Sequence, residues 1–178
     1  MRLDPKYFNL FLVVCGALTL IVIVFGTIMY VSNQQETFQE NLDETNLSEH
    51  FFMEYASDDS LSISQFSGEP VVIHFWSTWS GKSMEINEVL NEFKSENEDL
   101  IVIAAAARDG EELILEYMNE HSLPFYFVNG TDIYLDLLVP GLPSQIFISR
   151  NGEVVNTQVG ADVEELLQKL RALVSDNE

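Results

Sequence analysis

The chain has 178 residues, of which 29 are acidic and 8 basic, so its formal net charge is −21. This charge argues against a nucleic-acid-binding protein, because phosphate backbones are bound by clustered Lys and Arg. It also argues against docking on an anionic lipid surface. The only cysteine is Cys15, so the rest of the chain has no disulfide framework and no Cys-based metal site, and we expect no cofactor and no metal.

An apolar segment opens the chain. Residues 8–31 are apolar apart from Asn9 and two threonines, and they are long enough to cross a bilayer. They are too long for the apolar part of an ordinary signal peptide. Arg2 and Lys6 precede this segment and no further Lys or Arg occurs before Lys82, so the positive-inside rule places residues 1–7 in the cytoplasm. We therefore expect a single-pass protein of the bacterial inner (plasma) membrane with a periplasmic or other extracytoplasmic domain.

Two regions follow the apolar segment. Residues 32–50 are polar and acidic with sparse apolar positions, which predicts a stalk or a helix that forms with a partner. Residues 51–178 have the apolar patterning of a folded domain. Within it, residues 51–66 predict a strand or hairpin, and residues 67–70 predict a turn.

The central pattern of the domain is a strand, a tight turn and a helix. Val71 to Trp76 form a nearly continuous apolar run with His74 inside it, which is typical of a strand buried on both faces. A helical period begins after Gly81, with apolar residues at Ile86, Val89, Leu90 and Phe93. The turn from Trp79 to Ser83 is therefore displayed at a helix N-terminus.

The remaining elements alternate in type. The sequence predicts strands at 100–107, 125–128, 144–149 and 153–159, the last two joined by a turn at Asn151-Gly152, and helices at 109–121, at 131–138 and from 163 to 174. This order predicts an α/β domain.

The turn carries a family resemblance. The run Phe75-Trp76-Ser77-Thr78-Trp79 resembles the active-site segment of TlpA-like, membrane-anchored thiol–disulfide oxidoreductases, and Gly141-Leu142-Pro143 resembles their cis-proline segment. The resemblance covers roughly residues 58–174 and implies a thioredoxin-like fold, a central mixed sheet flanked by helices. It also implies that Ser80 and Ser83 stand where that family has its two cysteines, that Lys82 replaces a proline, and that Pro143 is cis.

Serine cannot supply the chemistry of that family. A helix N-terminus lowers a thiol pKa by at most ~1.5 units, which suffices for a thiol and falls far short for an alcohol. Serine also forms no disulfide. His74 is a further departure, because it stands where thioredoxins have a buried acid. These residues predict a redox-inactive domain rather than a thiol-based enzyme.

Two classes of function remain open at this stage. In the first, the protein binds a partner, either a subunit of a membrane complex or an extended peptide, in a groove lined by Trp76, Trp79, Gly81, Lys82, Leu142 and Pro143. In the second, it is an enzyme that uses Ser80 or Ser83 with His74, or a redox protein that borrows a partner's cysteine. A phosphate-binding P-loop does not fit Gly81-Lys82-Ser83, because its first glycine would fall on Trp76. The structural interpretation of Ser80 and Ser83 is that they cap the helix.

Overall fold

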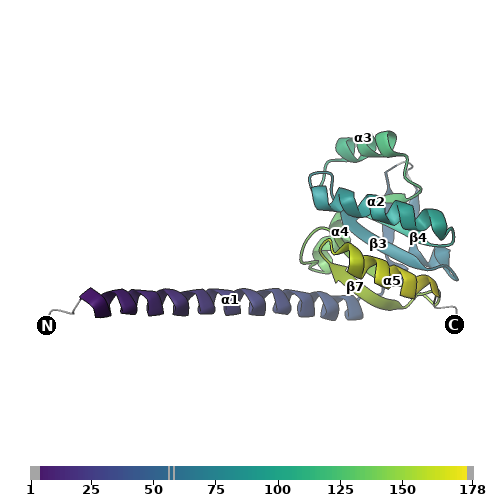
Figure 1. Cartoon of the computed structure of the whole chain (residues 1–178). Coiled ribbons are helices and arrows are strands. Elements are labelled where there is room, and N and C mark those ends of the chain that lie inside the picture. Colours follow the sequence, from purple (N-terminus) through teal and green to yellow (C-terminus); the bar gives the residue numbers. More distant parts are fainter. Residues whose placement is uncertain (1–4, 56, 58, 176–178) are drawn as a thin grey trace.

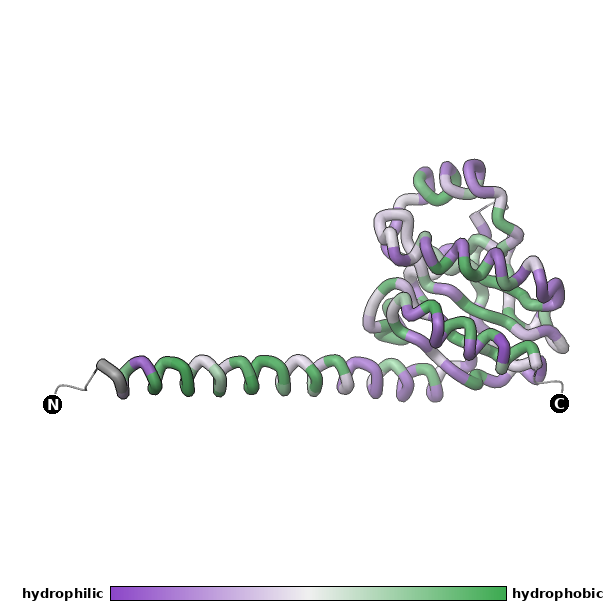
Figure 2. The backbone as a smooth tube through the Cα atoms, viewed as in Figure 1, coloured by the Kyte–Doolittle hydropathy of each residue, from purple (hydrophilic) through white to green (hydrophobic). Residues whose placement is uncertain are grey.

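The computed structural model describes residues 5–55, 57 and 59–175. A single long helix, α1 (Pro5–Glu44), projects from a compact α/β domain (Figure 1). Its first two thirds are apolar and its end is polar (Figure 2). Among the described residues, this helix is long and apolar enough to be a candidate membrane span.

The domain is built on one mixed sheet of seven strands in the order β2-β1-β5-β4-β3-β6-β7. Strands β3, β4 and β5 are parallel, and the other neighbouring pairs are antiparallel. The strands are β1 (Phe51–Glu54), β2 (Ser60–Ser62), β3 (Val71–Trp76), β4 (Ile101–Ala106), β5 (Tyr126–Asn129), β6 (Ser144–Ile148) and β7 (Val154–Val159). The helices are α2 (Gly81–Glu96), α3 (Glu111–His121), α4 (Thr131–Asp136) and α5 (Val163–Ser175), with 3-10 turns at Leu47–Glu49 and Ile63–Phe66.

Strand β3 is the centre of the core. All six of its residues are buried, as expected for an apolar strand between two covered faces. Val72 packs with α2 and α5 on one face, whereas Ile73 and Phe75 pack on the other face with Ile133 of α4. Figure 1 shows α2 and α5 lying across the same face of the sheet. The predicted thioredoxin-like fold is confirmed.

Most predicted strands of the domain shift by one residue at an end, and two helix boundaries differ by two residues. The helix expected over 131–138 ends at Asp136, because Leu138 takes a left-handed φ of 52° and Val139 N–H returns to the Tyr134 carbonyl. Asp109 and Gly110, expected to open the third helix, precede Glu111, its first residue.

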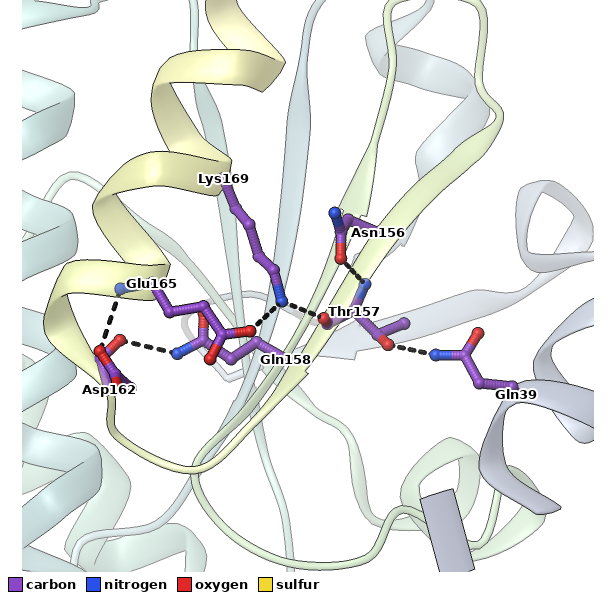
Figure 3. Close-up of polar contacts among 7 residues, drawn as sticks. All are labelled: Gln39, Asn156, Thr157, Gln158, Asp162, Glu165 and Lys169. Carbon is purple, nitrogen blue, oxygen red and sulfur yellow. Dashed lines mark hydrogen bonds and ion pairs between the residues drawn. The ribbon is translucent and has the colours of Figure 1, made fainter. Parts of the chain in front are cut away.

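The acidic segment 32–50 is joined to the domain. Helix α1 continues through it to Glu44, and Phe38, Leu42 and Leu47 are buried in the same cluster as Ile73. Gln39 donates a hydrogen bond to Thr157 of β7, beside Lys169 of α5 (Figure 3). Asn41 Nδ2 donates to the Leu137 carbonyl at 3.3 Å. The end of α1 is therefore packed along the domain.

Candidate functional site

The turn after β3 leads directly into α2. Ser80 is the N-cap of α2, and its Oγ accepts a hydrogen bond of 3.2 Å from the Ser83 amide, so its predicted capping role is confirmed. The same prediction was wrong for Ser83, whose side chain is buried and whose Oγ has no hydrogen-bond partner in the described part of the chain. Gly81 and Lys82 are exposed in the first turn, and Lys82 pairs with Glu85 at 2.8 Å.

The segment before β6 lies beside this turn. Phe75 and Ser144 are paired in the sheet, so Pro143 is level with the end of β3. The Leu142–Pro143 peptide bond is cis, which confirms the prediction. The segment is held from both sides, because Ser144 Oγ donates to the Gly141 carbonyl at 2.7 Å and Gly160 N–H donates to the Pro143 carbonyl at 2.8 Å.

A buried polar pair lies inside the sheet behind the turn. His74 on β3 and Gln145 on β6 are fully buried, and the Gln145 amide and the imidazole Nδ1 are 3.1 Å apart. Burial lowers the pKa of His74 to about 3, so the imidazole is neutral at ordinary pH. Neither the Ser80 nor the Ser83 hydroxyl is hydrogen-bonded to His74 among the residues that the structure describes, since Ser80 Oγ accepts from the Ser83 amide and Ser83 Oγ is unpaired there.

Asp109 fixes the conformation of the turn. One carboxylate oxygen accepts from Ser77 Oγ at 2.8 Å, from Thr78 N at 2.6 Å and from Thr78 Oγ1 at 2.9 Å. The other oxygen accepts from Gly110 N at 2.8 Å. Burial raises the pKa of Asp109, but these hydrogen bonds outweigh burial and hold the pKa below its ordinary value. The carboxylate is therefore ionised and ties the turn to the loop after β4.

Arg108, the residue before Asp109 in the same loop, holds the indole of Trp79. Trp79 Nε1 donates to the Arg108 carbonyl at 3.3 Å, and Arg108 N donates to Thr131 Oγ1 at 3.1 Å. Arg108 itself has a left-handed φ of 57°. Sequence reasoning missed both Asp109 and Arg108. The only signal was their position at the C-terminal end of a buried strand parallel to β3, where loops of a parallel sheet gather.

The described residues do not form the side-chain constellation of a Ser–His catalyst, because neither serine hydroxyl is hydrogen-bonded to His74. Trp79 is 65% exposed, whereas Trp76 is completely buried in the core, which removes Trp76 from the predicted groove. The described residues include no group of three or more His, Cys, Asp or Glu side chains that could hold a metal ion. The turn and the Leu142-Pro143 segment thus share one end of the sheet and present an aromatic side chain and backbone groups.

Comparison with known proteins points to one group. The chain is 23% identical over 167 residues to the thiol–disulfide oxidoreductase ResA of Bacillus subtilis (strain 168), covering 92% of both chains. A secreted disulfide oxidoreductase of Mycobacterium tuberculosis aligns with a TM-score of 0.60 and 19% identity, covering 70% of this chain and 96% of that one. StoA from Bacillus subtilis aligns with a TM-score of 0.56 and 14% identity, covering 68% and 95%. No protein-family model matches the chain. The chain therefore has a thioredoxin-like fold and is similar in sequence to thiol–disulfide oxidoreductases.

Proposed function

We propose that this protein is a redox-inactive, membrane-anchored relative of the thiol–disulfide oxidoreductases that binds a protein partner at the end of the sheet bearing Trp79. The observation that carries the proposal is that the Trp79 indole is exposed and yet held in one position. Trp79 is largely exposed, yet its Nε1–H is bonded to Arg108 and its turn is fixed by Asp109. A large aromatic side chain that is exposed and already ordered loses little entropy on binding, as binding hot spots require.

Backbone groups beside the indole support the same function. The amide N–H groups of Gly141 and Leu142 have no hydrogen-bond partner in the described part of the chain, and a Cβ at Gly141 or Gly81 would meet no atom within 4 Å. An extended segment of a partner could pair with these amides as an added strand while its side chains contact Trp79. Lys82 and Leu142 border the same surface.

The positions of serine and cysteine support the proposed redox inactivity. Ser80 and Ser83 occupy the positions that the resemblance assigns to two cysteines, and the sequence has only Cys15, inside the apolar part of α1. Ser80 Oγ serves as a helix cap and Ser83 Oγ is buried, and neither hydroxyl is hydrogen-bonded to His74 in the described part of the chain. We infer that α1 anchors the chain with residues 1–7 in the cytoplasm and the domain outside it.

A position-specific crosslinker tests the binding surface. A photoreactive amino acid at Trp79 should give a discrete partner adduct in native membranes. The same amino acid at Leu113, which is 52% exposed on α3, is the matched control and should not give that adduct. Trp79→Ala should reduce recovery of the partner about tenfold or more, the usual effect of removing a hot-spot residue. Equal adducts at both positions would show that the partner binds elsewhere.

A double substitution tests the inactivity. The unmodified chain should show no disulfide-exchange turnover, whereas Ser80→Cys with Ser83→Cys should form a local disulfide under oxidising conditions. The turn geometry and the helix N-terminus that favours a thiolate are both present, since the Ser83 amide already lies 3.2 Å from Ser80 Oγ. The single Ser80→Cys variant is the control. Turnover by the unmodified chain would overturn the proposal, and free thiols in the oxidised double variant would refute the assumed turn geometry.

A further inference from the structure

A concave surface lies between the polar part of α1 and α4, near the proposed partner site. It is a pocket of about 450 Å³. Asn33, Gln34 and Thr37 of α1 form one wall. The other wall is formed by Tyr134, Leu135, Leu138, Val139 and Pro140. Arg108 completes the lining. The carbonyl of Arg108 is the group that holds Trp79, so the pocket and the indole are neighbours.

The geometry of this pocket is set by how α1 is attached. Phe38 and Leu42 are buried in the core, and Gln39 is hydrogen-bonded to Thr157 (Figure 3). Asn41 is bonded to the Leu137 carbonyl just after α4. These contacts attach the end of α1 to the domain, so the two walls of the pocket are held in a fixed arrangement. Figure 1 shows α4 on the side of the domain from which α1 projects.

The pocket lies at a defined height above the apolar part of α1. The apolar run ends at Val31, and with a rise of 1.5 Å per residue Asn33 is about 3 Å and Thr37 about 9 Å farther along the axis. The headgroup layer beyond the hydrocarbon core is about 5–8 Å thick. Gln34 also donates to the Tyr30 hydroxyl at 3.0 Å, and tyrosine is enriched at this level of a membrane. If α1 spans a bilayer, the pocket is at headgroup depth.

The chemistry of the lining matches that depth. Arg108 is exposed, and in the described part of the chain its guanidinium has no carboxylate partner. Leu135 and Leu138 are exposed large apolar residues beside it. Trp79, also exposed, is the kind of residue that gathers at membrane interfaces. A cation above apolar side chains complements a phosphodiester above acyl chains.

We propose that this pocket holds the headgroup of one phospholipid of the outer leaflet, with its phosphate on Arg108 and its upper acyl chain against Leu135 and Leu138. The proposal rests on the membrane anchoring proposed above. The ligand is a zwitterionic lipid, because a chain of net charge −21 is repelled by an anionic surface and the pocket offers a single Arg. The domain then lies against the bilayer with the Trp79 surface close to it.

The test uses the full chain in nanodiscs of phosphatidylcholine with brominated acyl chains. In a Trp79→Phe background, Leu135→Trp places a fluorophore at the pocket, and Leu113→Trp places one on α3 at nearly the same exposure, 50% against 52%. The bromines should quench the Leu135→Trp emission several times more than the Leu113→Trp emission. Because the bromines are on acyl chains, free phosphate cannot produce this signal.

Substitutions of Arg108 distinguish a specific lipid site from a pocket that merely lies close to the membrane. Native mass spectrometry of the intact protein should show one retained phosphatidylcholine, with its apparent affinity reduced about tenfold by Arg108→Ala and largely kept by Arg108→Lys. Equal quenching at the two positions, or a lipid adduct unaffected by Arg108→Ala, would overturn the lipid site. Extraction of the chain from membranes at alkaline pH would instead overturn the anchoring itself, and the lipid site with it.

Discussion

A buried imidazole gives this domain a specific dependence on pH. His74 is completely buried in β3, and burial lowers its pKa from 6.5 to about 3. Between these two values the unfolded chain binds a proton at His74 that the folded chain does not, so acid favours unfolding. The neutral, buried His74 makes its full contribution to the free energy of unfolding above about pH 6.5. This contribution is lost as the pH falls toward 3, by at most about 1.4 kcal/mol per pH unit.

His74→Asn should therefore flatten the pH dependence. Asparagine keeps a polar group opposite Gln145 but carries no titrating proton, so its unfolding free energy should fall less steeply between pH 6.5 and 4 than that of the unmodified chain. Urea unfolding at a series of pH values measures this difference. The exposed His121 gives the control, His121→Asn, which should follow the unmodified chain. Parallel curves for His74→Asn and the unmodified chain would show that His74 is not buried in its neutral form.

Some features of the site could be predicted from the sequence, and others could not. The buried position of His74 and the cap at Ser80 follow from local patterns, a continuous apolar run and a serine before a helical period. Two contacts depend instead on which strands become neighbours: the hydrogen bond between Gln145 and His74, and the one that Asp109 accepts from the turn. No local pattern encodes that pairing, so these contacts appear only in the folded chain.

At the scale of elements, α1 serves as part of the domain core as well as a candidate membrane span. Its C-terminal part contributes Phe38 and Leu42 to the cluster that also contains Ile73 and Phe75. Phe38 and Leu42 are four residues apart and therefore lie on one face of a helix. In an otherwise polar segment, this spacing was the only sequence signal that the end of α1 packs on the domain. The strands and helices of the domain were predictable because each has a strong period, whereas a helix with a two-residue apolar face was not.

Phe38→Ala should therefore destabilise the domain as a core substitution does. Removing a buried phenyl ring costs about 3–5 kcal/mol, because the transfer free energy is lost and a cavity remains. Glu40→Ala, on the exposed side of the same turn, is the matched control and should change stability by no more than about 0.5 kcal/mol. Urea unfolding of the detergent-solubilised full chain gives both values. If the two variants unfolded alike, α1 would be a tether outside the core.

At the scale of the whole molecule, the dominant electrostatic feature is unpaired negative charge. The chain has 29 acidic and 8 basic residues, and the structure records three salt bridges among the residues it describes. Acidic side chains also follow one another along helix faces, as Glu88, Glu92 and Glu96 do at four-residue intervals on α2. Like charges at this spacing destabilise a helix. Folding therefore brings together charges that the unfolded chain keeps farther apart.

Salt should for this reason stabilise the folded chain. Raising the ionic strength from about 0.01 M to about 0.15 M shortens the screening length from about 30 Å to about 8 Å, which is below the dimensions of the domain. Each 1 kcal/mol recovered raises the melting temperature by about 2–4 °C for a chain of this size. Glu92→Lys, which alternates the charges along α2, should raise the melting temperature at low salt and reduce its further increase on adding NaCl. Thermal unfolding of the full chain in uncharged nanodiscs at both salt concentrations measures the two effects. A melting temperature independent of salt would mean that the carboxylates are already neutralised, by bound cations or by protonation, rather than repelling one another.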